Sequence, residues 1–197
     1  MVKIKTLLMM ALMFLAIGCQ QLTREQIIEK QAHEKMKQIE KEGFQRIQQQ
    51  IVNNLKYPES YESISTDMSI VTSDMVIYDS HAFVALRDLD RAMKNFNELY
   101  GNDSTSQEAR NELNAMKTLR GIVRDRAHVL GNRPVEFEGI DVYHQFYAND
   151  RPGHKAKKGY HYIFHKDNRT TLLCDDEEFQ RVKTFARQML KDAPYLH

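Results

Sequence analysis

The sequence contains no tryptophan and only four prolines, eight glycines and two cysteines in 197 residues. Proline and glycine are the residues that most strongly interrupt helices, so their scarcity favours a helix-rich chain. Neither sign of charge dominates, because the sequence contains 28 lysines and arginines and 27 aspartates and glutamates. A balanced chain has no overall field that would steer it onto nucleic acid, and we expect no nucleic-acid partner.

The common sequence motifs of catalysis are also missing. There is no G-x-S-x-G, no C-x-x-C and no glycine-rich phosphate loop, and residues 33–37 read HEKMK rather than the H-E-x-x-H of a zinc protease. A catalytic triad can be assembled from residues that are distant in sequence, so an enzyme remains open although no residue is nominated. No cofactor is predicted.

The N-terminus has the pattern of an export signal. Lys3 and Lys5 precede an uncharged apolar run of 11 residues, 7–17, and the small or apolar residues 16–18 lead into Cys19. A basic start, an apolar centre and a small-residue processing site are typical of a secretory signal peptide. The run is too short for a permanent membrane span, which needs about 20 residues.

Residues 15–19 read LAIGC. This stretch resembles the lipobox of bacterial lipoproteins, with Ala16 in place of the usual large aliphatic residue. The resemblance implies that residues 1–18 are removed as a signal peptide and that Cys19 is acylated as the first mature residue. Gln20 then fits sorting to an outer membrane, and the absence of an acidic cluster in QQLTR favours the side that faces the periplasm. The alternative is an ordinary secretory signal with a chance cysteine.

Residues 55–65, LKYPESYESIS, show a second resemblance. They are similar to a pattern in small uncharacterised bacterial lipoproteins, where a helix ends in Leu-Lys-x-Pro-x-Ser and runs into a strand. This resemblance implies no activity.

Removal of residues 1–18 would leave 26 basic and 27 acidic side chains, a net charge of 26 − 27 = −1. With Cys19 acylated, Cys174 has no cysteine left to pair with, so neither an intramolecular disulfide nor a cysteine-based metal site is expected. Asp175 and Asp176 would raise the pKa of Cys174 rather than activate it. We therefore expect Cys174 to be a small buried residue.

Helical periodicity divides the chain at Gly43. Residues 19–42 carry a thin apolar stripe among many charges and are expected to form a lipidated start and a polar helical tether, with Thr23 and Gln26 as a capping box. A single domain is expected to span residues 43–197. Its helices are predicted at residues 44–56, at residues 79–100 or 80–100, at 106–130 and after Asp175. The second and third, joined by about five residues, should form an antiparallel αα-hairpin.

The remaining segments alternate with a period of two, which predicts strands. These strands cover residues 64–70, residues 135–147, residues 160–165 and residues 170–174. The prediction is an α+β fold: an antiparallel sheet of about four strands, with packed N- and C-terminal helices on one face and a long αα-hairpin.

The alternation predicts one candidate binding surface. If the apolar rows of the two central strands face the core, the opposite face gathers Tyr143, Gln145, Tyr147, His161 and His165. Tyrosine and histidine on an open sheet face can hold a sugar or a peptide by stacking and hydrogen bonds. The alternative is a solvated face, or one covered by the N-terminal helix. His144, on the core side, is expected to be a buried, hydrogen-bonded histidine.

No metal site is predicted. His161 and His165 have the H-x-x-x-H spacing that binds zinc on a helix, but on a strand this spacing is roughly 13 Å, too far to share one ion.

A basic loop is predicted between the two central strands. Its cationic side chains could meet lipid phosphates, an acidic partner or an anionic glycan, although a basic hairpin tip can also serve solubility alone. The residues are Arg151, His154, Lys155, Lys157 and Lys158.

Together these features favour a lipid-anchored, non-catalytic binding or assembly module of the bacterial envelope, held in the membrane through its N-terminal lipid. An envelope protein or a glycan would be its partner. The alternative is an envelope hydrolase that uses His161 or His165 with Tyr143. A further hypothesis is that the helical hairpin docks a protein partner.

Overall fold

The computed structural model describes residues 22–101 and 105–191. Residues 1–21, which include Cys19 and the predicted signal sequence, and residues 102–104 and 192–197 lie outside these ranges. No helix within the described ranges is both long and apolar enough to cross a membrane.

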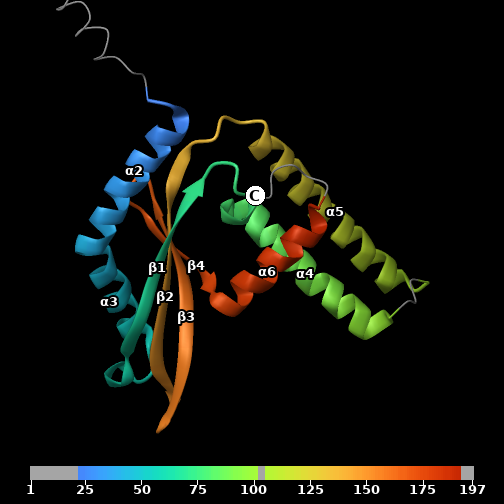
Figure 1. Cartoon of the computed structure of the whole chain (residues 1–197). Helices are drawn as coiled ribbons and strands as arrows, with labels where there is room; N and C mark the ends of the chain where they lie inside the picture. Colours follow the sequence, from blue (N-terminus) through green and yellow to red (C-terminus); the bar gives the residue numbers. More distant parts are fainter. Residues whose placement is uncertain (1–21, 102–104, 192–197) are drawn as a thin grey trace, which may run out of the picture.

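The N-terminal part of the domain is one long helical segment (Figure 1). It consists of α2 (Arg24–Gln38), the π-helical turn η1 (Ile39–Gly43) and α3 (Phe44–Asn54). Thr23 and Gln26 form the predicted capping box, in which the Gln26 backbone N–H donates to Thr23 Oγ1 and the Thr23 N–H donates to Gln26 Oε1. Gly43 does not interrupt the helix, because the wider π-turn carries the chain past it.

The structure differs from the tether expected for residues 19–42. Ala32 and Ile39 are each only 1% exposed and belong to the core that α3 and the sheet share. Lys35 is also buried and donates to Asn168 Oδ1 at 2.6 Å, in the turn between the last two strands. The apolar stripe is thin, but it lies flat on the sheet, so α2 is part of the domain rather than a spacer before it.

Four antiparallel strands form the sheet in the order β1-β2-β3-β4. Their bounds are β1 (Glu62–Thr72), β2 (Phe137–Arg151), β3 (His154–His165) and β4 (Thr170–Asp175). A short 3-10 helix, η2 (Pro58–Ser60), leads into β1. Tyr143 pairs with His161 across β2 and β3, and Gly139 pairs with His165. The turn before β4 uses Asn168 at a φ of 68°, a left-handed conformation that asparagine tolerates well.

A helical hairpin is inserted between β1 and β2. After η3 (Val76–Tyr78), α4 (Ser80–Tyr100) and α5 (Gln107–Gly131) pack along each other. Asp79 caps α4 by accepting from the Ala82 N–H at 2.9 Å and also pairs with Arg126 of α5. Burial would raise the pKa of Asp79, but Arg126 and the Ala82 N–H outweigh it and hold the pKa below its usual range. The Asp79 side chain thus joins the two helices at the base of the hairpin.

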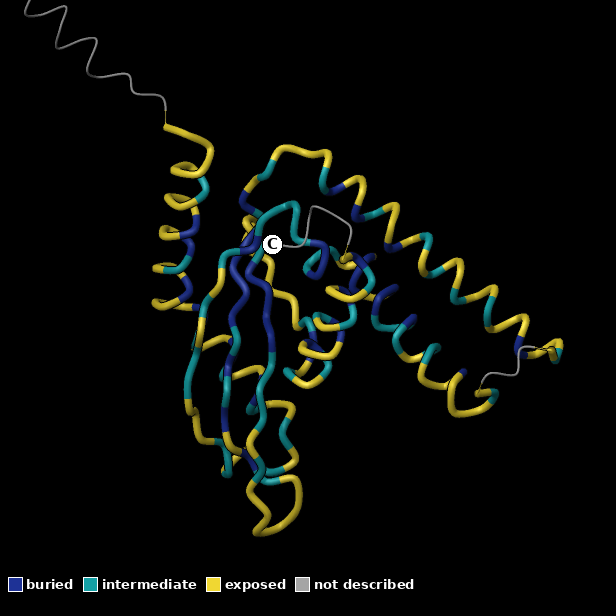
Figure 2. Tube along the Cα trace, turned by 45° about the vertical axis from the view of Figure 1, so that its right-hand side comes forward, coloured by how far each residue is buried: buried dark blue, intermediate teal, exposed yellow. Residues whose placement is uncertain are grey.

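The last helix, α6 (Asp176–Met189), begins as predicted at an acidic cap, where the Glu178 N–H donates to Asp175 Oδ1 at 2.8 Å. It lies on the sheet face opposite α2 and α3 and packs against the hairpin base (Figures 1 and 2). Phe179, Val182 and Ala186 form its buried side.

The sheet is therefore the middle of three layers, and the α+β prediction is confirmed. Even-numbered residues of β2, such as Ile140 and Val142, contact α2 and α3, whereas α6 and the hairpin base form a second core on the other side. The prediction of helices on one face only is wrong. Alternation shows which residues share a face, but it does not show that both faces are covered.

Candidate functional site

The structure brings three of the five predicted binding residues together on the odd-numbered face of β2 and β3. Tyr143 and His161 are cross-strand neighbours whose rings stack 4.7 Å apart between centroids. Gln145 lies two residues further along β2, and its Nε2 donates to the Tyr143 hydroxyl oxygen at 2.6 Å. Tyr147 and His165 lie toward opposite ends of the strands, where they pair with Lys157 and Gly139 respectively.

His161 is buried, in contrast to the expectation that it lies on an open sheet face. The residue is 4% exposed, and the ring of Phe179 from α6 stacks on it at 3.9 Å. Its Nδ1 lies 2.9 Å from Asp141 Oδ2, and its Nε2 lies 3.4 Å from Asp176 Oδ1. The start of α6 thus covers the histidine, a role that the sequence did not reveal.

Asp141 anchors this buried network. It is 4% exposed, and its Oδ2 accepts from the Tyr78 hydroxyl at 2.9 Å as well as facing His161. Burial, together with the negative charge of Asp141, raises the pKa of Tyr78. Tyr78 therefore stays neutral and donates its hydrogen. Hydrogen bonds in this way connect η3, β2, β3 and α6 across the covered face of the sheet.

Tyr143 links the buried network to the surface. Its hydroxyl donates to Asp176 Oδ2 at 2.9 Å, and Gln145 is held in turn by Ser65 of β1, whose Oγ donates to Gln145 Oε1 at 3.1 Å. Burial raises the pKa of Tyr143. Burial also opposes ionisation of Asp176, but hydrogen bonds from Gln180, Tyr143 and His161 outweigh it and lower the Asp176 pKa. Asp176 is therefore a carboxylate with fixed oxygens.

Gly159 allows the Tyr143 ring to lie flat against β3. A Cβ atom built on Gly159 would lie 2.7 Å from Tyr143 Cε2 and 2.8 Å from its hydroxyl oxygen. Such distances are too short for any side chain, so only glycine leaves Tyr143 in this position.

A hollow of about 480 Å³ opens beside these residues. Lys157 and Lys158 of β3 and the acidic start of α6 are all among the residues that line it. Tyr143 and Tyr160 also line it, and the Tyr160 ring stacks on Phe146 of the core that α2 and α3 cover. The full lining is Tyr143, Gln145, Lys157, Lys158, Gly159, Tyr160, Asp175, Asp176 and Glu177.

The predicted basic loop is mostly strand. β3 begins at His154, and its lysines continue the pairing with β2. The connection between the two strands is therefore only the short turn around Pro152 and Gly153. Lys155 forms an ion pair with Glu62 and lies 4.9 Å above the Tyr147 ring, and His154 faces Asp150. Arg151 closes β2.

Sequence reasoning missed the acidic residues that line the hollow. Residues 175–177 were visible only as the N-cap and first turn of α6, and nothing in the sequence placed them beside the same hollow as Lys157. Their signal was the cap itself, which fixes where the helix starts but not which face of the sheet it reaches.

Two residues behave as predicted. Cys174 is buried, and burial, helped by Glu178 and Asp175, raises its pKa to about 12. His144 is 2% exposed and has both ring nitrogens within 2.8 Å of a hydroxyl, from Tyr61 and Thr66.

His165 lies apart from the hollow and from Tyr143. Its Nε2 faces Thr171 Oγ1 at 3.1 Å, and burial followed by the charge of Arg169 lowers its pKa. Within residues 22–101 and 105–191, no group of three His, Cys, Asp or Glu side chains is arranged to hold a metal.

The fold and the hollow define an α+β protein with a three-layer core and a polar surface site of mixed charge. Comparisons with protein families, with curated proteins and with solved structures gave no match for this chain.

Proposed function

We propose that this protein is a lipid-anchored, non-catalytic module that faces the periplasm. It binds a short peptide of the bacterial envelope that carries one positive and one negative charge. The observation that carries the proposal is the hollow whose lining combines lysines with carboxylates. The N-terminal lipid would supply the membrane attachment.

The charges of the hollow match a ligand that carries both an ammonium and a carboxylate group. Among the described residues, no carboxylate lies within ion-pair distance of Lys157 or Lys158, and no cation lies within that distance of Glu177. Asp176 lines the hollow, and hydrogen bonds from Tyr143 and Gln180 already hold its two carboxylate oxygens in place. Groups that are held in place before binding lose little entropy when a ligand arrives.

The position of His161 supports binding rather than hydrolysis. His161 does not line the hollow, and Asp176 stands between its Nε2 and a ligand there. A general base must come within hydrogen-bond reach of the proton that it removes. His165, the other histidine of the hydrolase hypothesis, lies outside the hollow.

The double variant Lys157→Gln/Lys158→Gln is expected to weaken peptide binding about tenfold, because two partly exposed charge contacts are lost. The probe is a soluble cell-wall peptide fragment with a free ammonium and a free carboxylate. Its affinity for the full lipidated protein in detergent micelles is measured by isothermal titration calorimetry.

The matched control is Lys30→Gln/Lys37→Gln, which removes the same charge from the exposed side of α2 and should leave binding unchanged. A fragment with a capped amine and an amidated carboxylate should bind weakly. Equal binding by both lysine variants would contradict the proposal. Turnover of the fragment by the native protein would instead support the hydrolase.

The anchor is tested separately. Replacement of Cys19 with serine is expected to move the protein from the membrane fraction to the soluble fraction, because acyl chains cannot be attached to the serine hydroxyl by the lipoprotein pathway that the LAIGC stretch implies. Cys174→Ser is the control and should stay with the membrane. Retention of Cys19→Ser after an alkaline wash, or an unacylated mature N-terminus by mass spectrometry, would exclude the anchor.

A further inference from the structure

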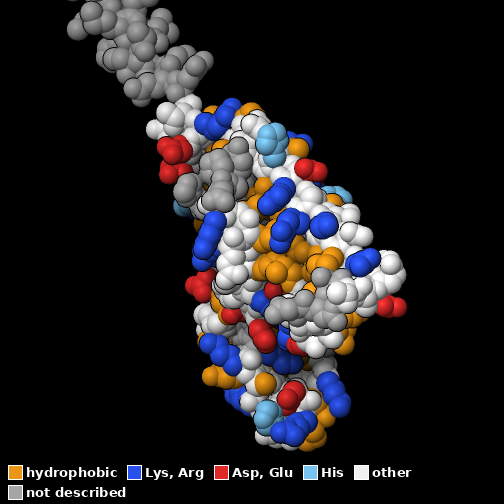
Figure 3. Space-filling view, turned by 90° about the vertical axis from the view of Figure 1, so that its right-hand side faces the viewer, with side chains coloured by type: hydrophobic (Ala, Val, Ile, Leu, Met, Phe, Trp, Pro, Cys, Tyr) orange, Lys and Arg blue, Asp and Glu red, His pale blue; other side chains and the backbone are white. Residues whose placement is uncertain are grey.

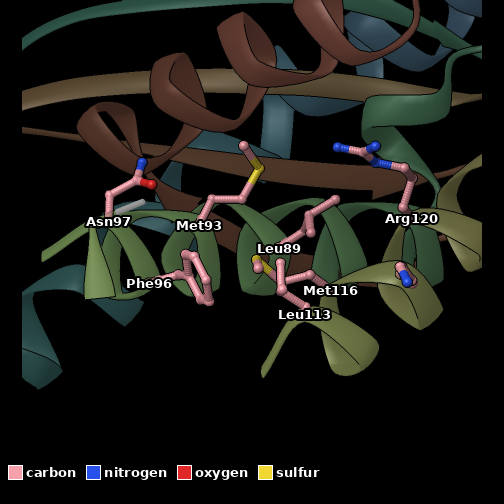
Figure 4. A pocket seen from close by; sticks show the side chains of 9 residues that line it. Leu89, Met93, Phe96, Asn97, Leu113, Met116 and Arg120 are labelled. Carbon is pink, nitrogen blue, oxygen red and sulfur yellow. The ribbon is translucent and has the colours of Figure 1, made fainter. Parts of the chain in front are cut away.

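The distal half of the helical hairpin contains an apolar groove that is separate from the hollow. It lies between α4 and α5 and has a volume of about 470 Å³. Its lining is Leu89, Met93, Phe96, Asn97, Gly101, Leu113, Met116, Lys117 and Arg120. Figure 4 shows Leu89, Leu113 and Met116 close together, with Met93 and Phe96 beside them on α4.

None of the residues that line the groove belongs to α6, the third helix of this layer. The core between α6 and the hairpin uses Phe83 and Leu86 of α4 with Val123 and Ala127 of α5, all nearer the base. Beyond them the two helices project from the body of the protein (Figures 1 and 2). Met93, Leu113 and Met116 remain only half-buried, so part of their apolar surface is exposed.

The groove has a rim of one charge sign. Of the described residues that line it, the charged ones are Lys117 and Arg120, both exposed cations. Within the described part of the chain, no carboxylate lies at ion-pair distance from either. Figure 3 shows the result as a hydrophobic patch in the middle of this face, with Lys and Arg side chains along its upper edge.

We propose that this groove docks an acidic amphipathic helix of a partner protein. From Leu113 to Arg120 the wall formed by α5 rises about 10 Å, which is two turns of a helix and fits apolar anchors at i, i+3, i+4 and i+7. The anchors would contact the apolar floor, and flanking glutamates would meet Lys117 and Arg120. Met93 and Met116 supply the flexible apolar surface that suits helix binding.

A recessed floor distinguishes a helix from a membrane as the occupant. Leu89 is fully buried and Phe96 is 9% exposed, so the most apolar part lies below the cationic rim. A flat bilayer cannot reach into such a groove, whereas the side chains of a helix can.

The test uses a synthetic 18-residue helical peptide with leucines at this spacing and glutamates on the flanks, and a second peptide with lysines in place of the glutamates. Binding to the full protein is measured by fluorescence anisotropy. The native protein should bind the acidic peptide. Lys117→Glu/Arg120→Glu should bind it about tenfold more weakly and should bind the lysine peptide instead.

Arg110→Glu/Arg124→Glu is the matched control, because it makes the same charge change on exposed positions of α5 outside the groove. Met116→Asp should abolish binding of the acidic peptide, and circular dichroism checks that each variant is folded. Equal affinity of the native protein for both peptides would overturn the proposal. So would saturable binding to anionic vesicles with none to the acidic peptide, or a dimer that Lys117→Glu/Arg120→Glu dissociates.

Discussion

Replacement of Asp141 with alanine is expected to lower the free energy of unfolding by about 2–6 kcal/mol, because two buried polar groups each lose a hydrogen-bond partner at a cost of about 1–3 kcal/mol. The Tyr78 hydroxyl and His161 Nδ1 both lose their acceptor in a region where water cannot replace it. Leaving buried polar groups unpaired costs more than the hydrogen bonds contributed. The measurement is urea unfolding at neutral pH.

Asp67→Ala is the matched control, since Asp67 lies on the neighbouring strand and is exposed. It should change the free energy of unfolding by less than about 0.5 kcal/mol. Asp141→Leu combined with His161→Phe should recover much of the loss, because apolar replacement of a complete buried pair is often tolerated. A loss below about 1 kcal/mol for Asp141→Ala would show that the network is not buried as described.

Replacement of Ile39 with alanine is expected to cost about 2–5 kcal/mol, the range for truncating a large aliphatic side chain in a core. Ile39 is 1% exposed and lies in the π-turn between α2 and α3, against Gly43 and the sheet core. The cavity left by the lost methyl groups cannot be filled by the long helix without bending it.

Ile27→Ala provides the comparison on the same helix, because Ile27 is 43% exposed. Its effect should stay within about 0.5 kcal/mol. The two variants distinguish a helix that packs on the sheet from an exposed tether at residues 19–42. If these residues formed a tether, both substitutions would be nearly neutral. Chemical unfolding monitored by circular dichroism gives both values.

The local sequence was sufficient for most elements. Thr23 with Gln26, Asp79 and Asp175 marked helix starts correctly, because a cap satisfies backbone N–H groups within one turn of itself. The period of two located four strands. The antiparallel arrangement was also predicted, but the sequence placed a basic loop where β2 and β3 continue to pair as far as Arg151 and His154.

The candidate site was predicted only in part. Alternation placed Tyr143, Gln145 and His161 on one face of the sheet, and the structure agrees. It could not show that Phe179 and Asp176 of α6 would cover His161, because the apolar stripe of a helix identifies the side that is buried but not the surface that buries it.

The sequence by itself determined the helices, the strands, their caps and the division of side chains between two sheet faces, since these depend on neighbours a few residues apart. The tertiary structure alone decided that α2 lies on the sheet, that His161 is enclosed, and that Lys157 and the start of α6 line one hollow. It also decided that the hairpin extends beyond α6 and leaves its groove open. Each of these depends on contacts between residues distant in the chain, where several packings would bury the same apolar stripes.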